Sequence, residues 1–442
     1  MIERKLRLAL NPYQMYSLVN REYDHSFLLE SMEGDEKLAR FSFIGFSPSS
    51  MMSARDGVFG RDGEEADSEN PIRALAAAIP RREAVREGFV GGAVGYFSYE
   101  YARRLERLPD GGKTASGFPD FEFGIFDDCL VYDHRDRSVR YITHGEDRSG
   151  ELVRLASEDA FLGPFQAGNP KTDAGEEEFV GAVASAKERI AEGEIFQVVL
   201  SRRYEFPFEG DMLRFYNVLK QSNPSPYMYH LSFGDRKIIG ASPENLVRVE
   251  GRTIESSATL AGTMQRGKSA AEDRALEERL KGDAKERAEH LMLVDLTRND
   301  VGKVARPGSV DVSGLMKVHK YSHVQHLGSH VSGELAEGKD CFDAFEALFP
   351  AGTLTGAPKV RAMEVIEELE RSRRGPYGGA VGYFSFNGNC DFAIAIRSLF
   401  ARRQKAYIQA GAGIVHDSVP EREYKETENK MRALMDALGA GA

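Results

Sequence analysis

The spacing of hydrophobic positions along the chain separates helical stretches from strand-like ones. Apolar residues that recur with a period of 3.6 mark amphipathic helices. The pattern predicts helices over 176–192, over 270–297 with a break near Gly282, from 359 to about 371, and in a C-terminal segment that opens at Ser418. That segment reads Ser-Val-Pro-Glu, which matches a capping box with proline in the first turn.

Short β-type runs dominate the first 160 residues, among them FSFIGFSP, GGAVGYFSYE and FEFGIFDDCLVYD, and similar runs recur later. Many strands and several long helices without strict βαβ alternation predict an α+β fold with mainly antiparallel sheets. A polar stretch containing Pro and Gly at 164–175 predicts a linker. The chain would then have an N-terminal domain over 1–163 and a second domain over 176–442.

An exact octapeptide, GGAVGYFS, occurs at 91–98 and again at 378–385. Both copies have the pattern of strands entered through a pair of glycines. We interpret them as two related sheet positions, one in each half of the chain. Different residues follow the two copies, so they need not share chemistry.

Composition narrows the class of protein. The chain has 442 residues, 41% of them hydrophobic, and a net charge of −11 that argues against nucleic-acid binding. Its three cysteines are widely spaced, as in a reducing compartment, and offer no zinc motif. No apolar run approaches about 18 residues, and the first ten residues are too charged for a signal peptide. We therefore expect a cytoplasmic protein without a membrane span.

Two glutamate pairs share one spacing, Glu286/Glu289 and Glu423/Glu426, and each lies in a predicted helix. Residues three apart lie on one helical face, so each pair presents two carboxylates to the same space. Buried carboxylates need a counter-charge or a metal, and Mg²⁺ usually takes one or two of them together with water. Two solvated helical faces are the alternative.

Several polar residues occur where a sheet could expose them to a ligand. Arg397 lies in the apolar run FAIAIRSLF, where an arginine needs a carboxylate partner or a ligand. Lys430 follows Glu426 by four residues, which fits either a surface pair or a cation beside a metal site. Tyr377 precedes the second glycine pair. The residues Gly411, Ala412 and Gly413 follow a strand and could form an anion-binding turn or an ordinary one.

Other candidates lie in loops and near strand ends. Glu244 follows the strand-like run KIIGA and is a candidate general acid, with a pKa raised by burial. Two glycine-rich turns carry hydroxyl groups, one with Gly262 and Thr263 and one with Thr353, but neither has the spacing of a phosphate-binding loop. His326 is one of four histidines between 319 and 330. On a strand or a helix, their spacing would point these side chains in different directions, which argues against a zinc site.

Together these motifs stand in a recognisable order: ASPENL, LAGT, AEHLMLVDLTRNDVGKV, KYSHVQHL, FPAGTLTGAPKVRAMEVI, YGGAVGYF, FAIAIRS and QAGAGIVHDSVPEREYKETENK. They resemble the chorismate-utilising enzymes, which include the synthases of anthranilate, aminodeoxychorismate, isochorismate and salicylate. The resemblance extends from about 176 to the end. In the first domain LLES at 28–31 and ARFSFIG at 39–45 resemble the anthranilate-forming member.

The resemblance implies two antiparallel sheets that enclose helices, with the active site between them. It implies that Glu289 and Glu426 hold Mg²⁺, with Glu286 and Glu423 as nearby or water-mediated partners. Mg²⁺ would anchor the ring carboxylate of chorismate. The resemblance implies that Arg397, Tyr377 and the 411–413 amides bind the enolpyruvyl carboxylate, and that Gly262, Thr263 and Lys430 complete the pocket. Glu244 would be the acid for the 4-hydroxyl. His326 and Thr353 would assist ring orientation and pyruvate loss.

Two positions distinguish the members of this family. Isochorismate and salicylate synthases have a lysine, which activates water, where this chain has Gln197. Aminodeoxychorismate synthases often have a nucleophilic lysine where this chain has Ala261. Neutral ammonia needs neither, so the resemblance implies ammonia addition followed by pyruvate loss, which gives anthranilate. The aminodeoxychorismate synthase of folate synthesis is the alternative, and Thr259 departs from the proline common in the family.

The resemblance also implies partners. The chain has no glutaminase signature, so ammonia from glutamine would require a separate glutaminase subunit. Feedback inhibition by L-tryptophan, the end product of the pathway, would use a site between Ser31 and the loop residues Pro226, Tyr227 and Met228. Plain structural turns are the alternative for these four residues. A non-catalytic tryptophan sensor is a further alternative, which the complete set of carboxylates argues against.

Overall fold

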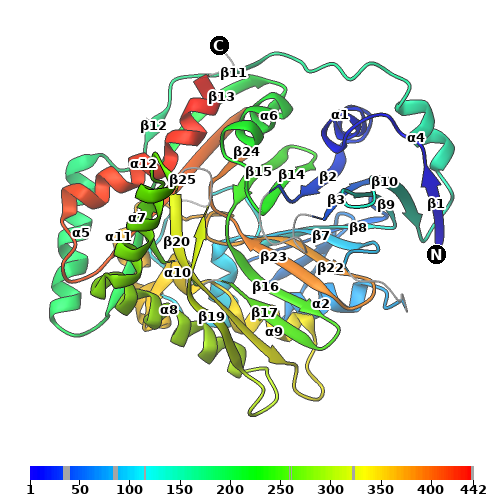
Figure 1. Cartoon of the computed structure of the whole chain (residues 1–442). Helices are drawn as coiled ribbons and strands as arrows, with labels where there is room; N and C mark the ends of the chain where they lie inside the picture. Colours follow the sequence, from blue (N-terminus) through cyan, green and yellow to red (C-terminus); the bar gives the residue numbers. More distant parts are fainter. Residues whose placement is uncertain are drawn as a thin grey trace.

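The computed structural model describes residues 1–32, 40–82, 88–113, 116–257, 259, 261–320 and 324–439, and the side chains of these residues except 261–263 and 324. All strand pairs in it are antiparallel, and they form two large sheets (Figure 1). Among the described residues, no helix is both long and apolar enough to cross a bilayer.

The first sheet has 13 strands within the described residues. In spatial order they are β1 (Ile2–Leu6), β10 (Ser138–Thr143), β9 (Asp128–Asp133), β3 (Phe41–Phe46), β2 (His25–Glu30), β14 (Tyr227–Phe233), β15 (Arg236–Ser242), β24 (Ser398–Arg402), β25 (Lys405–Ile414), β13 (Gln197–Gly210) and β11 (Phe165–Ala167), with β12 (Lys171–Thr172) and β21 (Gly356–Ala357) also paired to β13.

The second sheet has 12 described strands. Their order is β18 (Ala261–Gln265), β20 (Val324–Glu334), β17 (Thr253–Ser256), β16 (Asn245–Glu250), β23 (Cys390–Ile394), β22 (Ala380–Ser385), β7 (Gly92–Phe97), β8 (Phe121–Phe126), β4 (Ser50–Arg55), β5 (Val58–Arg61) and β6 (Glu64–Asp67), with β19 (Asp311–Lys320) paired to β20.

The described helices are α1 (Pro12–Glu22), α2 (Pro71–Ala78), the 3-10 turn η1 (Tyr99–Tyr101), α3 (Ala102–Leu105), α4 (Ser149–Leu155), α5 (Glu176–Ala191), α6 (Met212–Ser222), α7 (Ala270–Gly282), α8 (Ala284–Gly302), α9 (Cys341–Leu348), α10 (Gly352–Thr355), α11 (Lys359–Leu369) and α12 (Pro420–Gly439). The predicted helix over 270–297 is broken at the expected place, because α7 ends at Gly282 and Asp283 caps α8. Asp283 accepts hydrogen bonds from the backbone N–H groups of Lys285 and Glu286.

The two sheets pack face to face, and helices cover their outer faces. Alternate residues of a strand point to opposite faces. On β15, Ile238 therefore packs in the core between the sheets, whereas Ile239 packs in a core shared with α1, α6 and α12. On the outer face of the second sheet, the ring of Phe97 from β7 stacks on Phe345 of α9 at 4.1 Å. The α+β prediction with two antiparallel sheets is confirmed.

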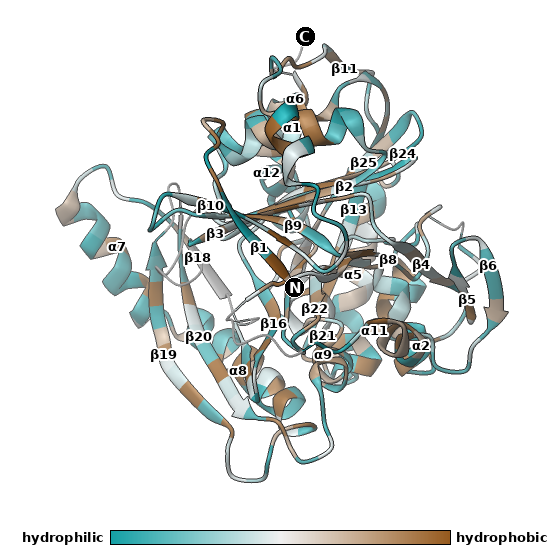
Figure 2. Ribbon diagram, turned by 90° about the vertical axis from the view of Figure 1, so that its right-hand side faces the viewer, coloured by the Kyte–Doolittle hydropathy of each residue, from teal (hydrophilic) through white to brown (hydrophobic). Residues whose placement is uncertain are grey.

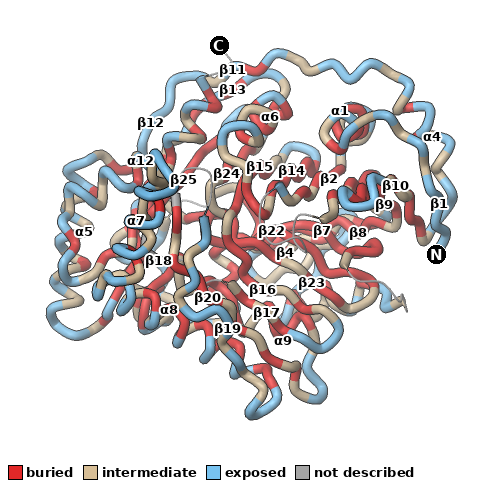
Figure 3. The backbone as a smooth tube through the Cα atoms, viewed as in Figure 1, coloured by how far each residue is buried: buried red, intermediate tan, exposed pale blue. Residues whose placement is uncertain are grey.

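Burial follows this layering. Figure 3 shows buried residues along the central strands and exposed residues along the outer loops and helices. Figure 2 shows hydrophobic residues on central strands such as β2 and β9, while α7 at the periphery is largely hydrophilic. The stretch predicted as a linker carries the short strands β11 and β12, and both sheets combine strands from 1–163 with strands from 176–442.

The repeated octapeptide forms two neighbouring strands. β7 and β22 pair antiparallel in the second sheet, and Gly95 lies opposite Gly382. A Cβ atom on either glycine would lie 2.0 Å from a backbone oxygen of the adjacent strand, Glu122 O or Asp391 O. The strands therefore require glycine at both positions, because β7 packs closely against β8 there and β22 against β23.

Candidate active site

The two glutamate pairs come from helices far apart in sequence, α8 and α12. Burial raises the pKa values of Glu286, Glu289 and Glu423, and the charge of Glu426 adds to each of these increases. The four carboxylates thus share one electrostatic environment. Glu426 is the most open of the four, with 47% of its side chain exposed.

Gln197, the first residue of β13, holds Glu289 in place. Its Nε2 donates a hydrogen bond of 3.0 Å to Glu289 Oε1, while its own Oε1 is buried with no partner in the part of the chain that the structure describes. Gly413 makes this contact possible, because a Cβ atom there would lie 2.7 Å from Gln197 Nε2 and 3.8 Å from Glu289 Oε1.

These carboxylates fit a hard divalent cation that brings its own water ligands. Three carboxylates with raised pKa values gather where a cation would offset their mutual repulsion. Within the described residues, no three acidic, histidine or cysteine side chains converge closely enough to form a complete protein cage. This arrangement suits Mg²⁺, which is usually held by one or two carboxylates together with water and substrate oxygens.

The segment with Gly411, Ala412 and Gly413 is a strand and not a turn, which corrects the prediction of a glycine nest. β25 continues to Ile414 because β13 pairs with it along its whole length. Its last pair with β24 is at Ile408, so among the described strands residues 409–414 are paired on one side only. The Ala412 side chain packs in the core with α5 and α11, which leaves only backbone atoms of this segment for the free edge.

Lys430 and Tyr377 occupy this free edge. Lys430 Nζ, on α12, donates a hydrogen bond of 2.8 Å to Gly411 O and lies 2.7 Å from Glu426 Oε1. Burial raises the pKa of the Tyr377 hydroxyl, while a backbone hydrogen bond with Gly411 and the charge of Arg374 oppose that increase. The structure thus connects the carboxylate site with the edge of β25.

Arg397 lies between β23 and β24 and not within a strand, which corrects a second expectation. Its φ is 51°, a conformation that is uncommon for residues other than glycine. Burial lowers its pKa, opposed by Tyr377, Glu244 and Glu426. In the described part of the chain, no carboxylate lies within ion-pair distance of Arg397, so its guanidinium is available to an anionic ligand.

Glu244 and Thr353, both predicted, are in direct contact. Thr353 Oγ1, on α10, donates a hydrogen bond of 2.9 Å to Glu244 Oε1. Glu244 is 5% exposed and lies directly before β16. The hydrogen bond from Thr353 orients this buried carboxyl group.

His326 lies on β20, and its register partners are Thr263 on β18 and His319 on β19. The side chain of Thr263 lies outside the described residues, as does His323, and Gly262 offers backbone atoms only, so the contacts of these residues stay predictions. α8 packs against both β18 and β20, and His290 Nε2 lies 2.6 Å from Ser329 Oγ of β20. These contacts place the His326 strand beside the helix of Glu289.

The four predicted inhibitor residues surround one cavity of about 830 Å³ between the two sheets. It is lined by Ser31, Pro226, Tyr227 and Met228 and by further residues of β2, β3, β14, β16, β22 and β23. The Ser31 hydroxyl is buried, with no hydrogen-bond partner among the described residues. The Met228 side chain packs in the core with α1 and α6, so this residue bounds the cavity from the opposite face of β14.

Sequence reasoning missed the polar wall of this cavity. Burial raises the pKa of Asp391 to about 6, while Arg248 opposes the increase. Tyr227 OH donates to Asp391 Oδ1 at 3.1 Å, and Asn245 Nδ2 donates to the same oxygen at 3.1 Å. The sign of this wall in the sequence is Asp391, a lone aspartate near the start of the apolar run CDFAI.

Comparison with known proteins gives one family. The model of the chorismate binding enzymes matches residues 24–436. Anthranilate synthase component 1 of Methanothermobacter marburgensis is 48% identical, covering 98% of this chain and 94% of that protein. The protein of the same name from Thermococcus kodakarensis is also 48% identical, with 99% coverage of both.

Solved structures agree. The crystal structure of anthranilate synthase component I from Streptococcus pneumoniae superposes with a TM-score of 0.79 at 36% identity, covering 91% of this chain and 93% of that one. The menaquinone-specific isochorismate synthase of Escherichia coli shares the fold, with a TM-score of 0.75 at 18% identity. The match covers 99% of this chain and 94% of that one.

The chain belongs to the chorismate binding enzymes. Within that family the chain is similar over nearly its full length to the anthranilate synthase component 1 proteins. It is a chorismate-utilising enzyme with lyase activity.

Proposed function

We propose that this chain is the synthase component that converts chorismate and ammonia into anthranilate and pyruvate, the first committed step of tryptophan biosynthesis. The observation that carries this proposal is the convergence of Glu289, Glu426, Arg397 and Lys430 around the edge of β25. Carboxylates that would hold a metal then lie beside cations that would bind a dicarboxylate, which supports the proposal.

Each part of the site has a task toward chorismate. Mg²⁺, held by Glu289 and Glu426 with Glu286 and Glu423 nearby, would supply Lewis-acid binding of the ring carboxylate. Arg397, Tyr377 and the free edge of β25 would bind the enolpyruvyl carboxylate, with Lys430 beside both.

The reaction needs a proton donor for the departing 4-hydroxyl group, and Glu244 would supply that proton. As ammonia forms its bond to C2, the two ring double bonds shift, the C4–O bond breaks and water leaves with the proton from Glu244, while the new ammonium group loses one proton. The C2 proton is then lost and the bond between ring C3 and the enolpyruvyl oxygen breaks, which gives the aromatic ring and enolpyruvate. A proton taken up at the methylene carbon of enolpyruvate gives pyruvate. Thr353 holds Glu244 during these steps, and we propose that His326 assists ring orientation.

Gln197 supports ammonia as the nucleophile. A primary amide is no base, and here its nitrogen is already committed to Glu289. Water would need a base at this position, whereas neutral ammonia has a free electron pair.

Ammonia would come from a separate glutaminase subunit. All three cysteines of the chain are buried, and burial raises the pKa values of Cys129 and Cys390. A glutaminase nucleophile needs an accessible thiol with a low pKa. The cysteines of this chain therefore do not suit glutamine hydrolysis.

The cavity between the sheets would bind L-tryptophan as a feedback inhibitor. Phe41, Phe43 and Tyr383 supply aromatic surface for an indole ring, and Arg248, Glu250 and Asp391 supply charges for the amino acid group. We expect Ser31→Ala or Met228→Thr to weaken tryptophan inhibition severalfold while kcat is preserved. Unaltered inhibition in both variants would contradict this site.

One assay tests the activity. Purified protein with chorismate, ammonium and Mg²⁺ should produce fluorescent anthranilate and an equal amount of pyruvate. Formation of 4-amino-4-deoxychorismate without pyruvate would indicate the folate-pathway activity instead. Tryptophan binding without any turnover of chorismate would indicate a sensor.

A further inference from the structure

The ion pair between Glu370 and Arg374 lies in the interior at the C-terminal end of α11. Arg374 is 1% exposed and Glu370 is 8% exposed. Arg374 Nη2 lies 2.6 Å from Glu370 Oε1, and Nε lies 2.9 Å from Oε2. The pair satisfies both carboxylate oxygens and orients the guanidinium plane.

The remaining hydrogen bonds of the pair reach segments that carry site residues. Arg374 Nη1 donates to Leu354 O at 2.7 Å, directly after Thr353 in α10. Arg374 Nη2 donates to Val199 O at 2.8 Å, and Val199 is the register partner of Gly413. Thus one guanidinium contacts both the helix that orients Glu244 and the strand behind the free edge of β25.

Glu370 also contacts β13, two residues after Val199. Its Oε1 accepts hydrogen bonds from the backbone N–H and the hydroxyl of Ser201, both at 2.8 Å. Ser201 is the register partner of Gly411. The pair therefore holds β13 opposite both glycines of the proposed carboxylate-binding edge.

Tyr377 completes the set of site residues around Arg374. The guanidinium carbon lies 5.8 Å from the centre of the Tyr377 ring and 4.4 Å from that of Tyr99. Gly378, with φ of 72°, packs beside them, because a Cβ atom there would lie 3.5 Å from Arg374 Nη1. The ring that faces Gly411 thus also lies against the same guanidinium.

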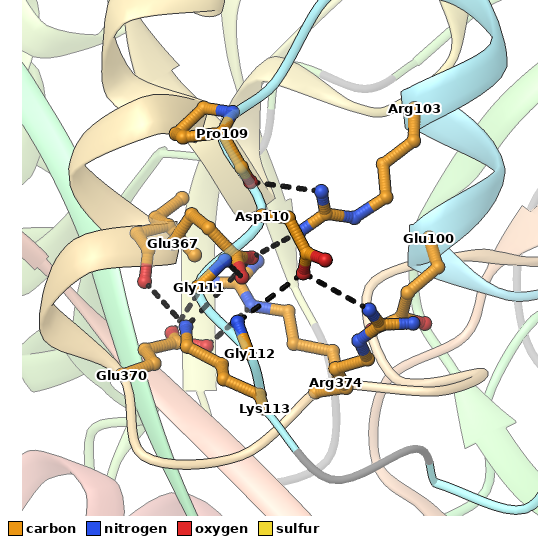
Figure 4. A network of polar contacts seen from close by, with 12 residues as sticks. Glu100, Arg103, Pro109, Asp110, Gly111, Gly112, Lys113, Glu367, Glu370 and Arg374 are labelled. Carbon is orange, nitrogen blue, oxygen red and sulfur yellow. Dashed lines mark hydrogen bonds and ion pairs between the residues drawn. The ribbon is translucent and has the colours of Figure 1, made fainter.

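A segment from the first half of the chain covers this end of α11. Gly111 N–H donates to Glu367 Oε1 at 3.1 Å, and Lys113 Nζ donates to Ile366 O at 3.2 Å. Figure 4 shows this segment crossing beside Glu370 and Arg374. This segment keeps water away from the pair. In the low-dielectric interior the interactions of the pair are stronger and its geometry is more fixed.

We propose that Arg374, fixed by Glu370, is a positioning residue of the reaction. It aligns Thr353, and through it Glu244, with the edge of β25 and with Tyr377. This role rests on the proposed function. Arg374 would contribute to the reaction without contacting the substrate. A salt bridge that only stabilises the fold would make the same contacts but would not couple to Thr353 in catalysis.

Arg374→Lys keeps the charge and loses the planar fork. We expect kcat/KM for chorismate to fall about 10²-fold in the folded variant, because a displacement of about 1 Å from productive geometry costs that much. The matched control is Arg236→Lys. Arg236 also forms a two-bond pair with a glutamate, Glu122, at 2.5 and 2.7 Å, away from the site. The control should lose thermal stability and keep kcat/KM.

A double-mutant cycle separates positioning from stability. Thr353→Ala alone should lower kcat/KM, and Arg374→Lys combined with it should be little worse than Arg374→Lys alone, because both act through Glu244. Fully multiplicative effects, or a folded Arg374→Lys enzyme within threefold of wild type, would overturn the positioning role.

Glu370→Gln provides a second route should the lysine variant fail to fold. It removes the charge and leaves the bonds of Arg374 to Leu354 O and Val199 O. We expect about a tenfold loss of kcat/KM and the same non-additivity with Thr353→Ala, and additive losses would overturn the proposal. Wild-type turnover is measured first: no anthranilate from wild type refutes the proposed function itself, whereas an active wild type with unaffected variants refutes only the role of Arg374.

Discussion

Gln197 and Glu289 determine much of the chemistry at the scale of single residues. The amide nitrogen of Gln197 donates a hydrogen bond to the Glu289 carboxylate and fixes its position. A neutral amide at this position leaves the negative charge of Glu289 available to a cation.

Loss of either proposed metal-binding carboxylate should lower turnover strongly. We expect Glu289→Gln and Glu426→Gln to lower Mg²⁺-dependent anthranilate formation by at least about 10²-fold. Folding should be preserved, because a glutamine at 289 can still accept the hydrogen bond from Gln197. Fluorescence assays over a range of Mg²⁺ concentrations measure the effect.

Asp295→Asn is the control for these variants. Asp295 is exposed on the same helix, with 71% of its side chain accessible, and its replacement should leave turnover unchanged. Full activity in both glutamine variants would reject the metal assignment.

Glu100 gives a prediction on pH and stability. Burial raises its pKa to about 7, with opposing hydrogen bonds from backbone N–H groups that include Gly375. The native state therefore holds a proton that the unfolded chain releases near pH 4.5. The stability associated with this proton is complete below about pH 4.5 and is lost as the pH rises to about 7.

Glu100→Gln should remove this loss. At pH 8 the free energy of unfolding of the variant should exceed that of wild type by up to about 3 kcal/mol, at about 1.4 kcal/mol per pK unit. The difference should disappear near pH 4.5. Urea unfolding at several pH values measures it, with the exposed Glu106→Gln as control. A difference that does not change with pH would contradict this account.

At the scale of elements, three strands connect the cavity with the site. Tyr227 on β14, Asn245 on β16 and Asp391 on β23 form one hydrogen-bonded cluster at the cavity wall. Asn245 directly follows Glu244, and the backbone oxygen of Glu244 accepts a hydrogen bond of 3.0 Å from Ile394 N–H at the end of β23. A ligand that moves this cluster would therefore move the proposed acid.

Tyr227→Phe tests this connection. The variant loses the hydroxyl that joins Asn245 and Asp391 and keeps the aromatic ring in the cavity. We expect tryptophan to bind within a fewfold of its wild-type affinity but to inhibit less completely at saturation. Calorimetric binding and inhibition curves on the same sample separate the two effects. Tyr13→Phe, whose hydroxyl donates to Leu213 O outside the cavity, should change neither.

At the scale of the whole molecule, the site depends on both sheets and on helices from distant parts of the chain. α8 and α12 bring the four carboxylates together, while α10 and β16 bring Thr353 to Glu244. This organisation requires the complete fold.

The isolated chain should use ammonium and not glutamine. Anthranilate formation with ammonium should increase with pH as the fraction of neutral ammonia increases. Glutamine should give no product until a glutaminase component is added, which a coupled fluorescence assay would measure. Glutamine-dependent turnover by this chain alone would contradict the separate subunit.

Local features of the site could be predicted from the sequence. The E-x-x-E pairs lie on helices as expected, and the break between α7 and α8 follows from Gly282 and the capping Asp283. These properties depend on backbone preferences and side chains within a few residues, so the order of residues alone determines them.

Other features were decided by tertiary structure. The 411–413 segment is a strand because β13, some 200 residues away, pairs with it, and Arg397 lies at a break between strands. The cavity and the Glu370–Arg374 pair arise where segments remote in sequence pack together. Strand pairing and the burial of charge depend on partners that no local pattern specifies, so the sequence by itself determined the helices and their carboxylates, whereas the fold alone decided what surrounds them.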